Sequence, residues 1–554
     1  MQTAVRFRDE TGRYLGRSFG RSSSQENRTD KGVSMLESMT TSKARSTMMT
    51  VTTSPRSPPP VSSHSGAVYR SLSPNQQDLA LSFFLTYVTD LGRGHQSSRG
   101  FVELVRPVLQ TERHDSALFA AVHAVATKIW VRLEFSLDNR SQQPMQLFSQ
   151  AIERLQKAVS DTKDRERDAT VLAALMLELY DTYSAVFDQK RPLGTHLDGA
   201  WALLLQRNGN AVRSRFHGKI ISHLLHSKVS MCIRERKAFN THEIEWLKKE
   251  AIPVLPNTPS SLLDIVGVSV ANLQSAYAAK KTDISSLPLE EWFRRVRLVE
   301  AQLEKWLEVI PQHWYPVRVN VGKGIESAVI AYQDTCDIYP NIQIASLWNV
   351  WRIYRLILLE INLQLAKTSI IGDNNTLGRA MDSTQRVREA QELLDSISYS
   401  VPFYLGNRVG PATLSDMGTP QCIFPSYHDL ISSHREAFLQ YQCSDSYMSE
   451  IDHSRHAILQ GPWRIMNILA YLEGLLAEED SLVGPQLLKA EQKDWILGQF
   501  FRSLYVQRLV PTCPLPKMTY QRDESHPRQI PFKALHAEHL ASKVRDGLWI
   551  MNIL

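Results

Sequence analysis

Cysteine is scarce in this chain: its 554 residues include only Cys232, Cys336, Cys422, Cys443 and Cys513. No two of these cysteines lie two or four residues apart, so neither a paired zinc-ligand motif nor a compact disulfide framework is indicated. The sequence also has no secretory signal built from basic, apolar and small-residue regions. We therefore expect a reduced, intracellular protein.

Long hydrophobic runs are also missing. Stretches such as residues 171–180 and 356–365 fall well short of the roughly 20 residues that span a bilayer, and each contains Glu or Asn. We expect a soluble protein.

Net charge is confined to the N-terminal part of the chain. Residues 1–70 hold 11 Lys or Arg and 5 Asp or Glu, and this surplus equals the formal charge of +6 of the whole chain. The other residues carry no net charge to attract a polyanion. Any contact with nucleic acid is therefore expected at the basic tail.

Ser, Thr and Pro dominate residues 21–70, as in the stretch TTSPRSPPPVSSHS. A segment with so few apolar side chains does not offset the entropy cost of ordering its backbone. We predict a disordered linker here, so that the folded part is preceded by a disordered basic N-terminal tail.

Helical periodicity begins directly after this tail. Ser73 and Pro74 form a helix-start signal, and apolar residues then recur at helical spacing. Such residues predict core-facing stripes, whereas sustained period-two runs are scarce. The fold class is therefore all-α, a large irregular multi-helix domain of about fifteen helices, with residues 400–424 as an interior loop. The stripes are Leu79, Phe83, Tyr87 and Leu91; Leu172, Leu175, Leu179, Tyr183 and Val186; Ile344, Leu347, Trp351, Tyr354, Leu358 and Ile361; and Trp463, Met466, Leu469, Leu472 and Leu476.

Catalytic and metal-binding templates are largely absent. No His-Glu-x-x-His helix and no phosphate-binding Walker loop occurs. Asp334 and Asp337, three residues apart and expected on one helix face, are the nearest approach to a paired-carboxylate cation site. A solvated helix face is the simpler interpretation, so we assign no catalytic, cofactor-binding or metal-binding residue.

One motif in the sequence is similar to that of a known protein family. Residues 195–209, THLDGAWALLLQRNG, resemble the His-x-x-Gly-Ala-x-x-Leu-Leu-x-x-Arg helix of the fungal-specific transcription-factor domain. Small residues in such a helix permit close helix contact, leucines fill the seam, and the histidine is expected to cap or bridge helices. The matching positions are His196, Gly199, Ala200, Leu203, Leu204 and Arg207. Asn208 departs from the pattern, because the family commonly has Gly directly after Arg.

Two further stretches are similar to the same family. Residues 302–317 contain Leu303, Trp306, Pro311 and Trp314 at the spacing of its Leu-x-x-Trp-x-x-x-x-Pro-x-x-Trp segment, and the closing helices carry Trp495 before Ile496. The resemblance spans residues 72–507. We interpret these residues as structural parts of a regulatory domain.

The resemblance implies a domain that follows a six-cysteine binuclear zinc cluster, yet no cysteine precedes Cys232. Zinc is therefore expected only if a cluster lies upstream, and otherwise DNA is reached weakly or through a partner. Residues 7–11, FRDET, are similar to the segment that follows the cluster in relatives. We divide the chain into a post-cluster remnant (1–20), a linker (21–70), the helical regulatory domain (72–510) and a C-terminal extension (511–554).

The resulting hypothesis is a fungal transcription regulator in the nucleus, not an enzyme, that works with the transcriptional machinery or a DNA-binding partner and controls a metabolic or biosynthetic gene set. The alternative is an all-α enzyme or small-molecule-binding protein without a recognisable catalytic motif. The target genes, an inducer and homodimer formation are left open by the sequence.

Overall fold

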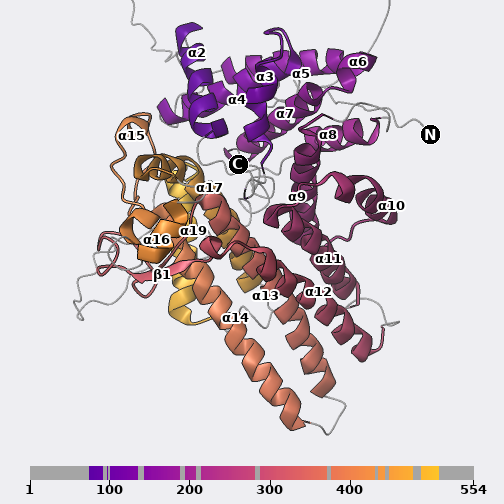
Figure 1. Ribbon diagram of the computed structural model, residues 1–554, viewed down its shortest axis with the longest axis vertical. Helices are drawn as coiled ribbons and strands as arrows, with labels where there is room; N and C mark the ends of the chain where they lie inside the picture. The colour runs from indigo at the N-terminus through magenta and orange to yellow at the C-terminus, as the bar shows by residue number, and fades with distance from the viewer. Residues whose placement is uncertain are drawn as a thin grey trace, which may run out of the picture. The chain divides into compact units, whose positions relative to one another are not determined.

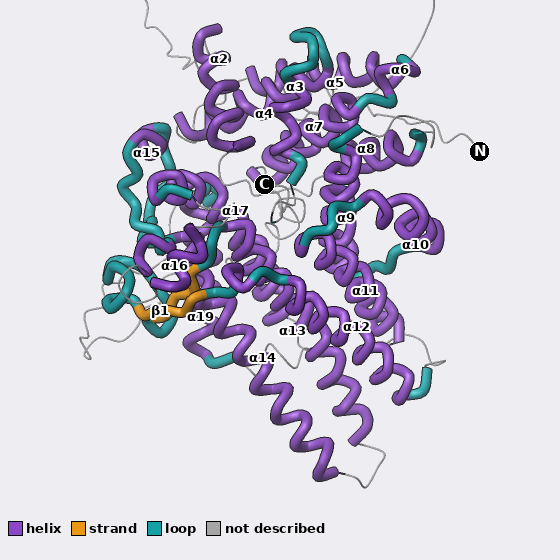
Figure 2. Tube along the Cα trace, in the orientation of Figure 1, coloured by secondary structure: helices purple, strands orange, loops and turns teal. Residues whose placement is uncertain are grey.

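The computed structural model describes residues 74–90, 97, 100–134, 143–187, 194–207, 214–280, 287–370, 376–430, 435–442, 448–477 and 488–510. These residues all belong to one of the two packing units of the chain. The predicted segments 1–20, 21–70 and 511–554 lie outside the described residues. The all-α prediction is confirmed: Figure 2 shows helices through nearly all of the described chain, together with one small strand pair.

The first group of helices surrounds one central helix, α7. Helices α4, α5 and α8 all pack against α7, and α4 also packs against α2 and α5. Residues 171–177 of α7 are completely buried, as a helix enclosed on several sides must be apolar all round. The five residues of its predicted stripe are all buried. The elements are α2 (Pro74–Phe83), η1 (Phe84–Asp90), η2 (Val102–Leu104), α3 (Val105–Leu109), α4 (Ala117–Glu134), α5 (Gln143–Ser160), α6 (Thr162–Arg165), α7 (Asp168–Phe187) and α8 (Thr195–Leu205).

The stripe predicted for the first helix is wrong at its start. Leu79 is 49% exposed, whereas Ala80, Phe84 and Val88 are buried. The α-helix gives way at Phe84 to the wider π-helix η1, and both Phe83 and Phe84 enter the core. Leu91 lies outside the described residues.

The second group runs from α9 to α12 (Figure 1). Helix α10 begins with a capping box in which Asn240 and Glu243 each accept from the other's backbone N–H, at 2.8 Å and 2.9 Å. Helix α11 packs against α9, α12 and α13. The elements are α9 (His217–Glu235), α10 (Thr241–Trp246), η3 (Leu247–Ala251), η4 (Ile252–Val254), α11 (Pro259–Lys280), α12 (Leu289–Val309) and η5 (Gln312–Trp314).

Helix α11 is, among the described residues, long and apolar enough to cross a membrane when judged by length and composition alone. The core helix of a soluble protein passes the same test, and 44% of the apolar window is buried here. Asp264 of α11 is fully buried and lies 2.9 Å from His226 Nδ1 of α9. Helices α9, α12 and α13 therefore cover part of α11.

A strand pair and a long helical hairpin follow. Strands β1 (Val317–Asn320) and β2 (Thr335–Ile338) pair antiparallel with Arg318 opposite Asp337, and β2 packs against α14. Helices α13 (Ile342–Ile370) and α14 (Thr376–Leu405) lie side by side, and α17 packs on both (Figure 1). The remaining elements are α15 (Ser415–Gly418), η6 (Tyr427–Leu430), α16 (Arg435–Gln442), α17 (Glu450–Ala477) and α19 (Ala490–Val506).

The interior loop predicted for residues 400–424 begins later than expected. Helix α14 continues through Pro402 to Leu405, although proline in a helix interior removes one backbone hydrogen bond. Phe403, Tyr404 and Leu405 are completely buried. Packing of these large side chains therefore outweighs the unfavourable helix propensity of Pro402.

Close backbone approach joins α14 to α17. A Cβ atom at Gly461 of α17 would lie 2.2 Å from the Tyr404 carbonyl oxygen, so only glycine fits there without a shift. Gly406 has a φ of +52° and ends α14 in the left-handed conformation that glycine tolerates.

Candidate functional site

The motif helix α8 is fixed at its N-terminus by a buried carboxyl group from α7. Gly194 precedes α8 with a φ of 69°, and the backbone N–H of Leu197 donates to Glu178 Oε2 at 3.1 Å. Glu178 is completely buried. Burial raises its pKa to about 8, since a charged carboxylate is poorly solvated there.

His196 lies between helices and away from solvent. Its Nε2 is 3.4 Å from Asp181 Oδ2 of α7, and its ring meets Phe148 of α5 edge to face at 6.0 Å. Burial lowers its pKa to about 4, so the imidazole is neutral at pH 7. The other apolar motif positions, Gly199, Ala200, Leu203 and Leu204, are buried on α8.

Arg207 follows the end of α8 and returns to the start of α7. Its Nη1 lies 2.8 Å from Asp168 Oδ1, and each side chain is about 10% exposed. The Ser214 hydroxyl donates to the other oxygen of Asp168, and Arg207 Nη1 also lies 3.4 Å from His217 Nδ1. The two remaining nitrogens of the guanidinium, Nε and Nη2, are buried and have no hydrogen-bond partner among the described residues.

A cavity of about 710 Å³ opens beside this pair. It is lined by residues of α3, α6, α7, α8, α9, α10 and η3, and by the segment that follows α3. Its volume falls within the range of small-molecule pockets. Arg207, Asp168, His217, Leu204, Leu205 and Trp246 are among its lining residues.

Most of the charge in the cavity wall is already paired. Arg167 Nη2 lies 2.5 Å from Glu112 Oε1, whose side chain is only 5% exposed, and desolvation raises the Glu112 pKa. Arg207 stands out because its charge is satisfied on one nitrogen only. No group of three or more His, Cys, Asp or Glu that could hold a metal ion occurs in the described part of the chain.

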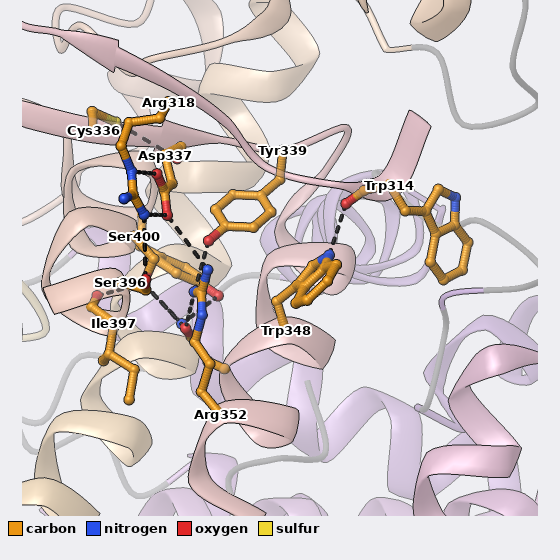
Figure 3. A network of polar contacts seen from close by, with 12 residues as sticks. Trp314, Arg318, Cys336, Asp337, Tyr339, Trp348, Arg352, Ser396, Ile397 and Ser400 are labelled. Carbon is orange, nitrogen blue, oxygen red and sulfur yellow. Dashed lines mark hydrogen bonds and ion pairs between the residues drawn. The ribbon is translucent and has the colours of Figure 1, made fainter. Parts of the chain in front are cut away.

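The second motif builds an aromatic cluster outside the cavity. Trp306 Nε1 donates to the Pro259 carbonyl of α11 at 2.7 Å, and its ring meets Trp348 of α13 edge to face at 5.9 Å. Trp348 Nε1 donates to the Trp314 carbonyl at 2.8 Å (Figure 3). Pro311 is the residue before η5. These residues join α11, α12 and α13.

The pair Asp334 and Asp337 is not on a helix, so that prediction is wrong. Asp334 is an exposed turn residue with a φ of 52°, whereas Asp337 is fully buried in β2. Asp337 accepts two hydrogen bonds from Arg318, at 2.8 Å and 3.2 Å, and lies 3.4 Å from Arg352 Nη2. Figure 3 shows both guanidinium groups pointing toward this carboxylate. The carboxylate of Asp337 is therefore buried between two arginines, and it does not lie on the solvated helix face that the sequence favoured.

Trp495 lies in α19. It is 7% exposed, and its ring centroid is 5.4 Å from that of Tyr332 in the segment before β2. It is remote in sequence from the residues that line the cavity.

Two buried arginines hold the C-terminal helices and were missed by the sequence reasoning. Arg502 donates to the carbonyls of Leu405 and Gly406 at the end of α14 and to that of Arg408. Arg408 donates to the carbonyl of Ile458 and to that of Val506. The Ile458 carbonyl lies four residues before Pro462, which has no N–H to donate the usual helix hydrogen bond. Burial lowers the Arg408 pKa to about 10. Pro462 inside an apolar helix was the available signal, because it frees a carbonyl.

Comparison with known proteins agrees with the resemblance. Residues 79–241 match the Fungal specific transcription factor domain. No curated protein and no solved structure matches the chain. The matched range contains the motif helix and most of the cavity wall, whereas Trp246 and Glu250 lie just beyond it.

The described residues form an all-helical body. A cavity of ligand size lies in it beside the motif helix α8. The match identifies the fungal specific transcription factor domain over residues 79–241, and it supports a fungal transcription regulator.

Proposed function

We propose that this chain is a fungal transcription regulator in which the helical body, residues 72–510, carries the regulatory activity. The observation that carries this proposal is the match of residues 79–241 to the Fungal specific transcription factor domain. Nuclear localisation and control of a metabolic or biosynthetic gene set are parts of the same proposal, on the grounds of that domain.

We further propose that DNA contact comes from a DNA-binding partner or from a module outside this sequence. A binuclear zinc cluster takes six cysteines, and the chain has five, none of them before Cys232. The net charge of +6 is concentrated in residues 1–70. Because contacts between basic side chains and phosphates do not read the base sequence, these residues supply at most non-specific contacts to DNA. The chain itself would then bind no zinc.

A small-molecule-binding role is the second candidate, and the cavity beside Arg207 favours it. Such a role is compatible with regulation, since a ligand that prefers one conformation shifts the population toward it. The transcription-factor domain argues against an enzyme, so the proposal assigns the chain no catalytic role.

A reporter assay tests the regulatory role. The full chain is fused to an unrelated DNA-binding domain, and transcription from a promoter with its binding sites is compared with that of the DNA-binding domain alone. The expected result is a changed reporter level. A fusion that accumulates in the nucleus, melts cooperatively and leaves the reporter unchanged contradicts the proposal.

The zinc content of the purified chain tests the second part separately. We expect less than stoichiometric zinc by plasma emission and no shift of duplex DNA at physiological salt. One or two tightly bound zinc ions per chain would overturn the assignment of DNA contact to a partner or a separate module, while leaving the reporter prediction in place.

A further inference from the structure

Only one of the three nitrogens in the guanidinium of Arg207 has a hydrogen-bond partner among the described residues. Nη1 bonds Asp168 at 2.8 Å, whereas the buried Nε and Nη2 donate to no described residue. A buried N–H without an acceptor is unfavourable because it has lost its water and gained no partner. The arrangement is therefore incomplete, unlike that of Arg502, whose Nε, Nη1 and Nη2 all have acceptors.

Asp168 does not complete the arrangement. One of its oxygens accepts from Arg207 and the other accepts from Ser214, so the carboxylate is shared between two donors. The Nε and Nη2 side of a guanidinium presents two parallel N–H groups, the arrangement that binds two oxygens of one planar carboxylate or of one phosphate.

The cavity that Arg207 lines has room for such a group and for an apolar remainder. Its volume is about 710 Å³, and Leu204, Leu205 and Trp246 contribute apolar surface. The acidic residues Glu166 and Glu250 are also in its wall. With Glu112 and Asp168 the wall holds four acidic side chains, against the basic Lys163, Arg167 and Arg207. This small acidic excess disfavours a polyanion, so the wall is suited to a ligand with a single anionic group.

We propose that this cavity binds a small organic anion, whose carboxylate or phosphate group accepts hydrogen bonds from Nε and Nη2 of Arg207 while its apolar part packs on Leu204, Leu205 and Trp246. Binding requires the guanidinium to turn its covered edge toward the cavity that the side chain lines. This site rests on the small-molecule-binding role named above and gives its ligand a chemical class, whereas it does not depend on the regulation of transcription.

Calorimetry on the purified full chain tests the site with four probes: hexanoate, hexyl phosphate, hexanol and inorganic phosphate. We expect saturable binding of hexanoate or hexyl phosphate, and binding at least about tenfold weaker for hexanol, which lacks the anionic group. The stronger of hexanoate and hexyl phosphate identifies a carboxylate or a phosphate as the natural group. Inorganic phosphate lacks the apolar part and should bind more weakly than hexyl phosphate; equal affinities would contradict packing of that part on the apolar wall. Binding of neither anion at concentrations up to about 10 mM overturns the proposal.

Variants locate the binding. Arg207→Lys keeps the charge but removes the paired N–H edge, and we expect it to weaken binding about tenfold or more. Arg294→Lys, on the exposed face of α12, is the matched control and should bind as the unaltered chain does. Equal affinity of Arg207→Lys and the control would place the anion elsewhere and overturn the proposal.

Variants at Leu205 test the same site while Arg207 stays unchanged. Leu205 lines the cavity and is 46% exposed, so charged residues are tolerated there without loss of the core. We expect Leu205→Lys to bind the anion several-fold more tightly and Leu205→Glu several-fold more weakly than Leu205→Gln. Should Arg207→Lys fail to fold by circular dichroism, this pair decides, and identical affinities of the three Leu205 variants overturn the proposal.

Discussion

Asp337→Asn tests the network of Figure 3, because it removes one buried charge and keeps the size of the side chain. Arg352, 5% exposed at its side chain, then keeps a positive charge in the interior with only neutral partners. Removing one partner of a buried ion pair costs about 3 to 5 kcal/mol. We expect the lower end, about 3 kcal/mol, because asparagine still accepts one hydrogen bond and the half-exposed Arg318 can turn to water.

Urea unfolding of the full chain measures this change. The slope is about 3 kcal/mol per M at the top of the range for small proteins and grows with size, so the midpoint should fall by up to about 1 M. Asp334→Asn is the matched control, since Asp334 is exposed and asparagine tolerates its positive φ. We expect the control to lie within about 0.5 kcal/mol of the unaltered chain. A variant at Asp337 as stable as the control would refute the reasoning.

Three further predictions concern buried groups elsewhere. Because Glu178 has a pKa raised to about 8, its ionisation weakens the fold as pH rises from about 5 to 8. Between pH 5 and pH 8 the free energy of unfolding of Glu178→Gln should therefore rise by up to about 4 kcal/mol relative to that of the unaltered chain. A difference in urea midpoint between the two proteins that is the same at pH 5 and at pH 8 contradicts this. Arg502→Met leaves three carbonyls without their donor and should cost about 3 kcal/mol in urea unfolding, against less than about 0.5 for Arg294→Met. Gly461→Ala should lower stability by about 2 kcal/mol or more because of the 2.2 Å approach, whereas Gly410→Ala meets no atom within 4 Å; equal melting temperatures of these two variants would contradict the close packing of α14 and α17.

The helical class could be predicted because the signal is local. Spacing of three and four residues marks the stripe of α7, and all five of its residues are buried. The family motif could be recognised for the same reason, since residues 195–209 carry it within one helix and one turn. Strands β1 and β2 were missed because four residues each are too short for a period of two to stand out.

The cavity and the buried arginines depend on residues that are distant in the sequence. Arg502 meets carbonyls nearly a hundred residues away, and Arg207 meets Asp168 across the whole of α7 and α8. Such contacts follow from how the helices pack, and a periodic pattern carries no information about them. The end of α14 could not be predicted for the same reason. The helix continues past Pro402 because the residues after it are buried, and that burial depends on how the helices pack.

The proposed regulation of transcription is tested most directly in the organism that encodes this chain. The measurement combines promoter occupancy of the tagged chain with transcript levels after deletion of its gene. We predict that the tagged chain occupies a defined set of promoters and that transcripts from those genes change on deletion. A chain that occupies no promoter and whose deletion changes no transcript would contradict the account.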